Sequence, residues 1–462
     1  MTSALQPSAQ LLDTPPPSAQ PFTDELWACV EREKAIHGLQ NLVRAIKRYH
    51  RRGLELRGVN RQDLALDAAS GTLYLVAAPR CRAVEDRSMS GLAAESIWRD
   101  GRLVGELAYE NFMGETYPGG HQMAALLQDR ATMAEIGLLH PGLPQLVATC
   151  VSPYGELAML DINDLSDALE QLRREVLRKF TYRVGARSTV GNYVFRRNNQ
   201  DSCAYVLMES SLGSMTQSVG FFCVADGIGG IHDGERASAL AAQSACRAFG
   251  RAMAHYGGEE IARRPGDFAR AIVHITSQRL ALEGEFAPEK NRGGTTFTCL
   301  ILAGNRAGVG HAGDSRAVLI RDGALLAITR DHTLASIFKE LGEPPTNPEQ
   351  ADTNSRTISR FLSTSMELEP SRVDGISPAF ATSLSDAPVD LTQMNHIGFE
   401  VRPNDLFLLT SDGVHDELSA ERLGQLVAMH ATAPQKLVDA LINQALRQVG
   451  RDNATAMAIR VE

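Results

Sequence analysis

The strongest constraint on the fold is a set of short apolar runs in the second half of the chain, most of them next to glycine, aspartate or asparagine. The runs are VGFFCVA, TTFTCLILA, RAVLI, DLFLLTS and ATAMAIRV, at residues 219–225, 295–303, 316–320, 405–411 and 454–461. Such runs predict β-strands. Amphipathic stretches at residues 234–256 and 267–284 predict long helices. Strands clustered with helices, but without regular alternation, predict an α+β domain.

Length and composition limit the class of protein. A chain of 462 residues is too long for one core of ordinary size, so we expect two or more domains. The net charge of −9 argues against nucleic acid or an anionic membrane as the main partner. The sequence has no uncharged apolar run of about 18 residues, so we expect no membrane-spanning helix. The seven cysteines are scattered and lack C-x-x-C spacing, which predicts reduced thiols in a cytoplasmic protein.

The first half of the chain differs from the second. Residues 1–22 are rich in proline, serine and glutamine and predict a disordered leader. Residues 23–180 predict a separate α/β region. Within it, apolar spacing predicts an amphipathic helix over residues 24–49, two short strands within residues 51–80, and a helix around residues 161–180.

Three aspartates lie where apolar runs begin or end. Asp226 and Asp412 each follow a run and precede a glycine, and Asp452 comes just before the last run. An isolated Asp-Gly pair is usually a turn, because aspartate hydrogen-bonds its own backbone and glycine accepts positive φ. Strand ends, however, combine a rigid backbone with an exposed tip. Since Mg²⁺ and Mn²⁺ prefer oxygen ligands, the set of carboxylates predicts a divalent-metal site.

Six motifs in the second half carry a resemblance to a known family. They are RRNNQD at 196–201, FFCVADGIGGIHDGERAS at 221–238, RGGTT at 292–296, GVGHAGDSRAVLIRDGALLAITRDHT at 308–333, LFLLTSDGVHDEL at 406–418 and RDNATAMAI at 451–459. In this order they resemble the motifs of the type 2C metal-dependent Ser/Thr protein phosphatases, also called PPM. The resemblance implies that residues 181–462 form a central antiparallel β-sandwich flanked by helices, in four αββα layers.

The resemblance also implies a reaction and a metal site. The reaction is the hydrolysis of phosphoserine and phosphothreonine in proteins by a hydroxide that bridges two Mn²⁺ or Mg²⁺ ions. Asp226 would bridge both ions, and Gly227 would offer its carbonyl oxygen to one of them. Asp412 and Asp452 would complete the shell of the other ion. Asp314 would help to bind a third, weaker ion.

Two further residues are expected to act in catalysis, and two depart from the family pattern. Arg196 would grip the substrate phosphate, because a planar guanidinium matches two phosphate oxygens. Asp201 would orient metal-bound water from the outer shell. Gln200 replaces the usual glutamate, and Ile228 stands where some members carry a histidine that protonates the leaving group. These departures leave open an alternative, a pseudophosphatase or scaffold that binds phosphoproteins without turnover.

Histidines and hydroxyls near the motifs have simpler interpretations. His311 lies in an apolar turn and is expected to be structural. His332 and His232 flank the predicted site and are candidates for proton transfer. Thr296 and Ser315 are expected to shape the aspartate loops through hydrogen bonds rather than to act as nucleophiles.

The role of the first half remains open between two interpretations. The segment YHRRGLELRGVNRQDLALDAASGTLYLVAAP faintly resembles a protein-kinase catalytic loop, with Gly58, Asp63 and Ala77 at positions that carry the phosphoryl-transfer residues. The alternative is an unrelated regulatory or docking domain, and both interpretations predict a non-catalytic half. Expected partners are a phosphorylated protein substrate and a cognate Ser/Thr kinase or its targets, with no nucleic acid and no membrane. The proline-rich stretch over residues 334–401 is expected to form a variable flap beside the site.

Overall fold

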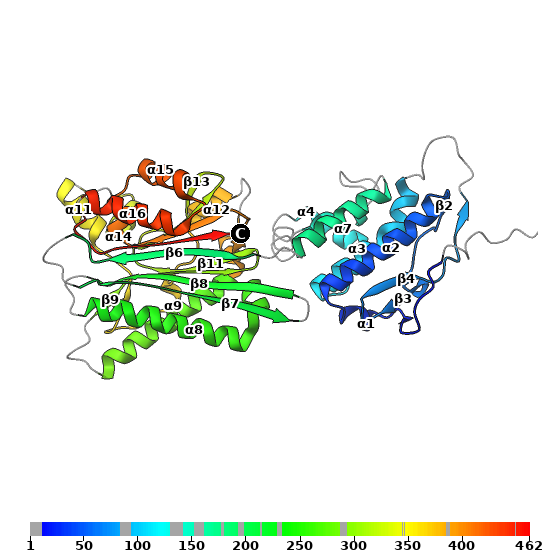
Figure 1. Ribbon diagram of the computed structural model, residues 1–462, viewed down its shortest axis with the longest axis horizontal. Helices are drawn as coiled ribbons and strands as arrows, with labels where there is room; N and C mark the ends of the chain where they lie inside the picture. Colours follow the sequence, from blue (N-terminus) through cyan, green and yellow to red (C-terminus); the bar gives the residue numbers. More distant parts are fainter. Residues whose placement is uncertain are drawn as a thin grey trace, which may run out of the picture. The chain divides into compact units, whose positions relative to one another are not determined.

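The computed structural model divides the chain into two compact units, Met1–Arg178 and Lys179–Glu462 (Figure 1). Each unit has its own buried core. The residues that the structure describes are 12–83, 94–129, 142–151, 161–176, 180–192, 198–212, 215–228, 233–286, 293–343, 345, 347–384, 389–448 and 450–462. Among these residues no helix combines the length and the apolar character needed to cross a bilayer.

Helices form the larger part of the N-terminal unit. They are α1 (Asp24–Ala28), α2 (Arg32–His50), α3 (Ala94–Met113), α4 (Gly120–Gln128), α6 (Leu143–Val151) and α7 (Ile162–Val176). The single helix predicted over residues 24–49 is therefore wrong, because the chain turns between α1 and α2. This turn accompanies the burial of Trp27, whose indole Nε1–H donates to the carbonyl of Leu107 on α3 at 2.9 Å.

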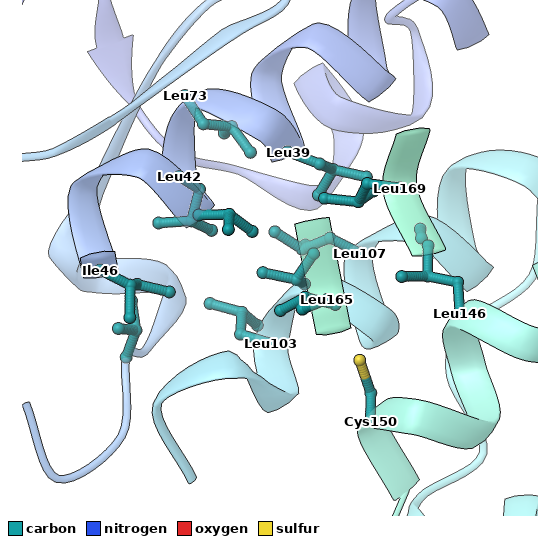
Figure 2. Packing of buried hydrophobic residues seen from close by; sticks show 14 of the residues in the cluster. Leu39, Leu42, Ile46, Leu73, Leu103, Leu107, Leu146, Cys150, Leu165 and Leu169 are labelled. Carbon is teal, nitrogen blue, oxygen red and sulfur yellow. The ribbon is translucent and has the colours of Figure 1, made fainter. Parts of the chain in front are cut away.

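One face of α2 forms the centre of this unit's core. Its apolar side chains recur every three or four residues, and Leu39, Leu42 and Ile46 are fully buried. They lie in one cluster with Leu107 of α3 and Leu165 of α7 (Figure 2). Burying a leucine contributes about 1.5–3 kcal/mol, so this three-helix contact stabilises the unit.

Short strands complete the N-terminal unit. A three-stranded antiparallel sheet has the order β1-β3-β4, and a two-stranded one pairs β2 with β5. Their bounds are β1 (Gln20–Pro21), β2 (Leu54–Glu55), β3 (Leu64–Asp67), β4 (Thr72–Leu75) and β5 (Arg82–Ala83), with a 3₁₀ turn η2 at Arg61–Asp63. The hairpin of β3 and β4 confirms the strands predicted within residues 51–80.

The prediction of a disordered leader that reaches residue 22 is wrong. From residue 12 onward the chain lies against the N-terminal unit, and β1 pairs with β3. Asp13 explains why, because its backbone N–H donates to the carbonyl of Leu75 at 2.9 Å and its carboxylate accepts the N–H of Leu75 at 2.8 Å. Arg48 of α2 also forms an ion pair with Asp13. These contacts order a segment whose composition alone indicates disorder.

Two five-stranded antiparallel sheets form the middle of the C-terminal unit, with the orders β15-β11-β10-β8-β7 and β13-β12-β16-β17-β6. A third pairing joins β9 to β14. The strands are β6 (Tyr182–Thr189), β7 (Asp201–Leu212), β8 (Met215–Asp226), β9 (Gly294–Thr295), β10 (Phe297–Ala303), β11 (Arg306–Ala312), β12 (Arg316–Arg321), β13 (Ala324–Ala327), β14 (Leu362–Ser363), β15 (Phe399–Glu400), β16 (Leu406–Thr410) and β17 (Ala454–Val461). All five apolar runs of the sequence are strands here.

The two sheets pack face to face, and helices cover both outer faces (Figure 1). Side chains alternate along each strand: on β8, Phe222 and Val224 point between the sheets, whereas Phe221 and Cys223 pack against the helices. Helices α8 (Gly234–Arg263) and α9 (Pro265–Phe286) cover the first sheet, and α15 (Ala420–His430) and α16 (Pro434–Gln448) cover the second. The unit is therefore α+β with four layers, as predicted.

The segment between β13 and β16 is more structured than a variable loop. It contains α10 (Leu334–Leu341), α11 (Pro348–Arg356), a 3₁₀ turn η3 (Pro370–Arg372), α12 (Pro378–Leu384) and α13 (Leu391–Ile397). Thr333, Asn347 and Asp390 each cap the helix that follows, through a side-chain oxygen that accepts a backbone N–H. We call residues 334–401 the flap segment below.

Candidate functional site

The aspartates that the sequence singled out gather at one end of the β-sandwich. Asp201 begins β7 and Asp226 ends β8, and the two are directly opposite each other in the ladder. Asp412 begins the short helix α14 (Asp412–His415), just after β16 ends. Asp452 lies just before β17, which pairs with β16. Four segments far apart in the sequence therefore converge, because antiparallel pairing returns the chain to the same edge.

Ser411 joins the two sheets at this end. Its hydroxyl donates to Oδ2 of Asp201 at 2.7 Å and accepts the N–H of Thr455 at 3.0 Å. The N–H of Ser411 donates to the carbonyl of Thr455, also at 3.0 Å. Asp201, 6% exposed, is thereby fixed to the strands that carry the aspartates of the other sheet. Ser411 was not singled out from the sequence, although it directly precedes Asp412.

A threonine fixes the end of β8. The hydroxyl of Thr296 accepts the N–H of Asp226 at 3.0 Å, and the N–H of Thr296 donates to the carbonyl of Asp226 at 2.8 Å. The same hydroxyl lies 2.8 Å from that of Ser315. Thr296 and Ser315 thus shape the aspartate loops by hydrogen bonding, as expected. Gly227 follows in a crowded turn, where a Cβ atom would lie 2.4 Å from the carbonyl oxygen of Gly234.

Asn453 connects the last aspartate to β7. Its N–H donates to Oδ1 of Asp452 at 2.7 Å, and its Oδ1 accepts the N–H of Gln200 at 2.9 Å. Its Nδ2 donates to the carbonyl of Val190 at 3.0 Å. The carbonyl of Gln200 in turn accepts the N–H of Gly227 at 3.0 Å. Backbone bonds of this kind hold the loops whatever the side chain at position 200.

Asp314 lies in the turn between β11 and β12 and is 9% exposed. The preceding residue, Gly313, has φ +123°, a conformation that favours glycine, and a Cβ there would lie 2.5 Å from Cβ of Thr296. The turn is therefore pressed against the residue that holds Asp226. Arg316, two residues on, forms a bidentate ion pair with Asp331, with Nε–Oδ1 and NH2–Oδ2 distances of 3.0 and 2.7 Å.

The clustered carboxylates raise one another's pKa values. Burial first, and then the charges of Asp201, Asp412 and Asp314, hold the pKa of Asp226 well above its usual range. Burial, with Asp452 as the largest charge, raises the pKa of Asp412 to about 7. Burial likewise raises the pKa of Asp201 and of Asp314 to about 6. A concentration of negative charge this strong indicates a place where a cation is stable.

Orphaned oxygen atoms indicate the same. Within the described residues, Oδ1 of Asp201, of Asp314 and of Asp412 is buried and has no hydrogen-bond partner. Buried polar atoms normally have one. In the described part of the chain, no three His, Cys, Asp or Glu side chains form a group that could hold a metal ion, so other donors would have to contribute. Carboxylate oxygens supplemented by backbone carbonyls and water are the donor set of Mg²⁺ and Mn²⁺, so the residues present fit such an ion.

The other candidate residues are placed as follows. Arg196 and His232 lie outside the described residues. His311 is 1% exposed, with Nδ1 2.9 Å from the hydroxyl of Thr298 and Nε2 2.8 Å from the carbonyl of Arg330, which fits a structural residue. Ile228 donates its N–H to the carbonyl of Gly294, and its side chain offers no acid.

Comparisons with known proteins identify a family. Residues 196–449, more than half of the chain, match the family model described as Protein phosphatase 2C. The Ser/Thr protein phosphatase PstP of Mycobacterium tuberculosis is 31% identical over 285 residues, which are 60% of this chain and 45% of that protein. The Ser/Thr phosphatase stp of Listeria monocytogenes is 25% identical over 236 residues, 51% of this chain and 82% of that protein. The chain thus spans less than half of the length of PstP.

Two solved structures are also similar. The crystal structure of M. tuberculosis PstP/Ppp is 28% identical and has a TM-score of 0.45, over 60% of this chain and 98% of that one. The PstP catalytic domain in complex with two manganese ions is 28% identical and has a TM-score of 0.44, over 61% and 99%. Since the family model covers most of the C-terminal unit and more than half of the whole, the chain belongs to the protein phosphatase 2C family.

Proposed function

We propose that this chain hydrolyses phosphoserine and phosphothreonine in proteins with the help of two Mn²⁺ or Mg²⁺ ions. The observation that carries the proposal is the set of buried carboxylate oxygens without a partner in the described structure, on Asp201, Asp314 and Asp412. The relatives named above are Ser/Thr phosphatases, and one of them contains two manganese ions. Bound ions of this kind supply an activated water and neutralise the charge of the phosphate.

Each residue has a task that its surroundings support. Asp226, Asp412 and Asp452 would hold the ions together with the Gly227 carbonyl, and Asp314 would hold a third. Asp201 would order water beside them, because Ser411 already occupies its Oδ2 and leaves Oδ1 available. We assign the grip on the phosphate to Arg196 from the motif alone.

The test is hydrolysis of p-nitrophenyl phosphate and of a phosphothreonine peptide by the full chain. We expect turnover with Mn²⁺, none after EDTA, and loss of turnover in Asp412→Asn with an unchanged circular dichroism spectrum. Asp390→Asn is the matched control, because Asp390 caps α13 from the surface and asparagine caps as well. Metal-independent turnover would refute the mechanism.

The second candidate is a pseudophosphatase or scaffold, and Gln200 and Ile228 are the observations that favour it. Phosphopeptide binding without turnover in Mn²⁺, Mg²⁺ or Co²⁺ would support it over hydrolysis. The intact set of five aspartates favours the enzyme, because binding a phosphopeptide needs cationic groups rather than clustered carboxylates.

The N-terminal unit is proposed to regulate or target the phosphatase and to have no catalytic activity of its own. Asp63 is 3% exposed, and its Oδ2 accepts the N–H of Asn60 at 2.9 Å and a guanidinium N–H of Arg80 at 3.0 Å, so the carboxylate is already engaged. Gly58 and Ala77 have no side chain that could bind metal or move a proton. A kinase-like origin of this unit stays a prediction.

A protease site inserted between Arg178 and Lys179 tests the regulatory role in a chain that folds intact. Cleavage should leave turnover of p-nitrophenyl phosphate unchanged but alter turnover of phosphorylated protein substrates. If both rates stay the same, the N-terminal unit does not act on catalysis or on substrate choice.

A further inference from the structure

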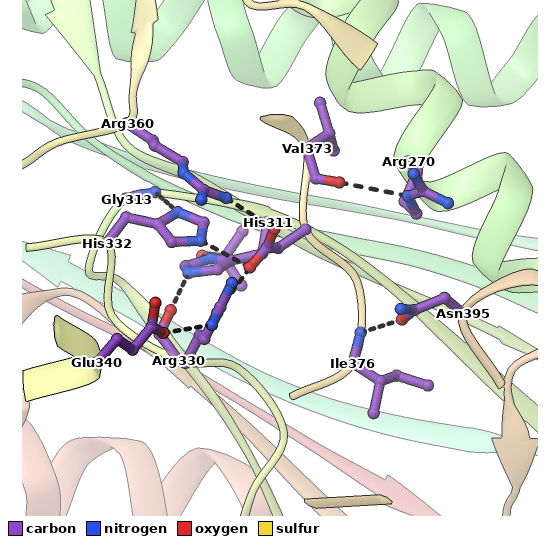
Figure 3. A network of polar contacts seen from close by, with 12 residues as sticks. Arg270, His311, Gly313, Arg330, His332, Glu340, Arg360, Val373, Ile376 and Asn395 are labelled. Carbon is purple, nitrogen blue, oxygen red and sulfur yellow. Dashed lines mark hydrogen bonds and ion pairs between the residues drawn. The ribbon is translucent and has the colours of Figure 1, made fainter. Parts of the chain in front are cut away.

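Asp374 of the flap segment contacts three basic side chains. Figure 3 shows these three, Arg330, His332 and Arg360, converging on one place. Asp374 accepts hydrogen bonds from Nε of Arg330 at 2.9 Å, from Nε2 of His332 at 3.0 Å and from NH1 of Arg360 at 2.8 Å. Burial opposes the charge of Asp374, but His332 and Arg330 stabilise it more, and its pKa is held well below the usual range. A charged carboxylate with three donors is a rigid anchor.

His332 connects this anchor to the turn that carries Asp314. The ring Nδ1 of His332 accepts the backbone N–H of Gly313 at 3.1 Å, and the backbone N–H of His332 donates to the carbonyl of Gly313 at 2.8 Å. A backbone N–H can only donate, so Nδ1 has no proton, and the proton of the neutral ring is on Nε2, where it faces Asp374. Both ring nitrogens are therefore engaged, which argues against His332 as a proton donor to a leaving group.

The same anchor reaches the metal site by a second path. Asp374 and His311 exchange two backbone hydrogen bonds, at 2.9 and 3.0 Å. His311 contacts the hydroxyl of Thr298, which lies 3.0 Å from the carbonyl of Ser315. Ser315 in turn contacts the threonine that fixes Asp226. The flap segment is thus connected by hydrogen bonds to both aspartate loops.

We propose that His332 is a positioning residue through which Asp374 of the flap segment sets the Gly313–Asp314 turn, and with it the affinity for the ion at Asp314. This inference rests on the proposed metal site. Asp374, which no sequence motif marked, thereby gains a role. Metal affinity would then depend on the conformation of the flap segment.

Two conservative variants separate the two hydrogen bonds of the ring. Oδ1 of asparagine occupies the place of Nδ1, so His332→Asn keeps an acceptor for the N–H of Gly313 and loses the donor to Asp374. Nε2 of glutamine occupies the place of the ring Nε2, so His332→Gln keeps the donor to Asp374 and loses the acceptor. Removing groups that support metal ligands typically weakens metal affinity 10- to 100-fold.

The experiment is Mn²⁺ binding by the full chain, measured from the electron paramagnetic resonance signal of free Mn²⁺. We expect the weakest binding step to weaken about 10-fold or more in both His332 variants, because His332→Gln loses the contact with the turn and His332→Asn loses the contact with Asp374. Asp374→Asn should weaken the same step, whereas Arg372→Ala, an exposed neighbour in η3, should not. Wild-type affinity in either His332 variant, or in Asp374→Asn, would overturn the proposal.

Two controls keep the outcome unambiguous. If wild type binds no Mn²⁺, the proposed function itself fails, whereas normal wild-type binding with unaffected variants refutes only the role of His332. If the variants do not fold, nitrogen-15 NMR of the wild type decides the matter, because the inference requires an unprotonated Nδ1 and a protonated Nε2 at neutral pH. The opposite tautomer would overturn it.

Discussion

Replacing Ser411 by alanine should destabilise the C-terminal unit by about 2–4 kcal/mol. The hydroxyl is the donor to Oδ2 of Asp201 and the acceptor for the N–H of Thr455, and both neighbours are buried, with 6% and 0% exposure. Leaving a buried N–H unpaired costs about 1–3 kcal/mol, and a hydrogen bond to a charged group contributes about 1.5–3 kcal/mol. The expected loss is smaller than the sum of the upper values of these two contributions, because Asp201 can take up a proton when its donor is removed.

The assay is urea unfolding of the full chain in EDTA, followed by two signals. The only tryptophans of the sequence, Trp27 and Trp98, lie in the N-terminal unit, so fluorescence reports on that unit. Hydrogen exchange of β17 amides reports on the C-terminal unit. Ser411→Ala should lower the stability seen by exchange and leave the tryptophan transition unchanged. Ser355→Ala, an exposed residue on α11, is the control. A loss below about 0.5 kcal/mol, the range of surface substitutions, would refute the reasoning.

Three further outcomes are expected. Burial lowers the pKa of His311 to about 3. Below pH 6.5 the unfolded chain therefore binds a proton that the folded unit does not bind. As the pH is lowered, the free energy of unfolding decreases by up to ~1.4 kcal/mol per pH unit. His311→Gln should make this acid slope shallower in urea titrations between pH 6.5 and 4, whereas the exposed His255→Gln should not. Gly227→Ala should destabilise the C-terminal unit by about 1–3 kcal/mol or more, because the new Cβ would lie 2.4 Å from a carbonyl oxygen. Gly250→Ala places its Cβ in open space on a helix, so thermal melts should show the unit stabilised by up to about 1 kcal/mol. Mn²⁺ should raise the melting temperature of the C-terminal unit, and Asp412→Asn should reduce that rise; an equal rise in this variant would contradict the assigned site.

The apolar runs predicted strands well because β10, β16 and most of β17 are buried on both faces, whereas the sandwich itself was predicted from the family resemblance. Runs such as TTFTCLILA lack the helical spacing of apolar residues that a surface helix shows, and flanking glycines and aspartates mark where such runs end. The leader was misjudged for the opposite reason. The order of residues 12–22 comes from long-range contacts, such as those of Asp13 with Leu75, and composition cannot show them.

The candidate site was predicted in part. Aspartates next to glycine at strand ends are visible in a sequence, and the structure brings them to one end of the sandwich. Ser411 was missed because a serine between a strand and an aspartate carries no signal by itself. Asp374 was missed because it lies in an irregular stretch, 42 residues from His332, and only the fold brings the two together. Side chains that act through a second residue leave no local pattern.

The position of β17 has a consequence for how the C-terminal unit is assembled. This strand lies between β16 and β6, inside its sheet rather than at an edge. During synthesis the second sheet therefore stays split until residues 454–461 have left the ribosome, and Asp452 arrives with them. A nascent chain that lacks this strand would hold most of the unit's apolar surface but would lack part of the proposed metal site. If the proposed function holds, phosphatase activity would then appear only after β17 has been inserted between β16 and β6.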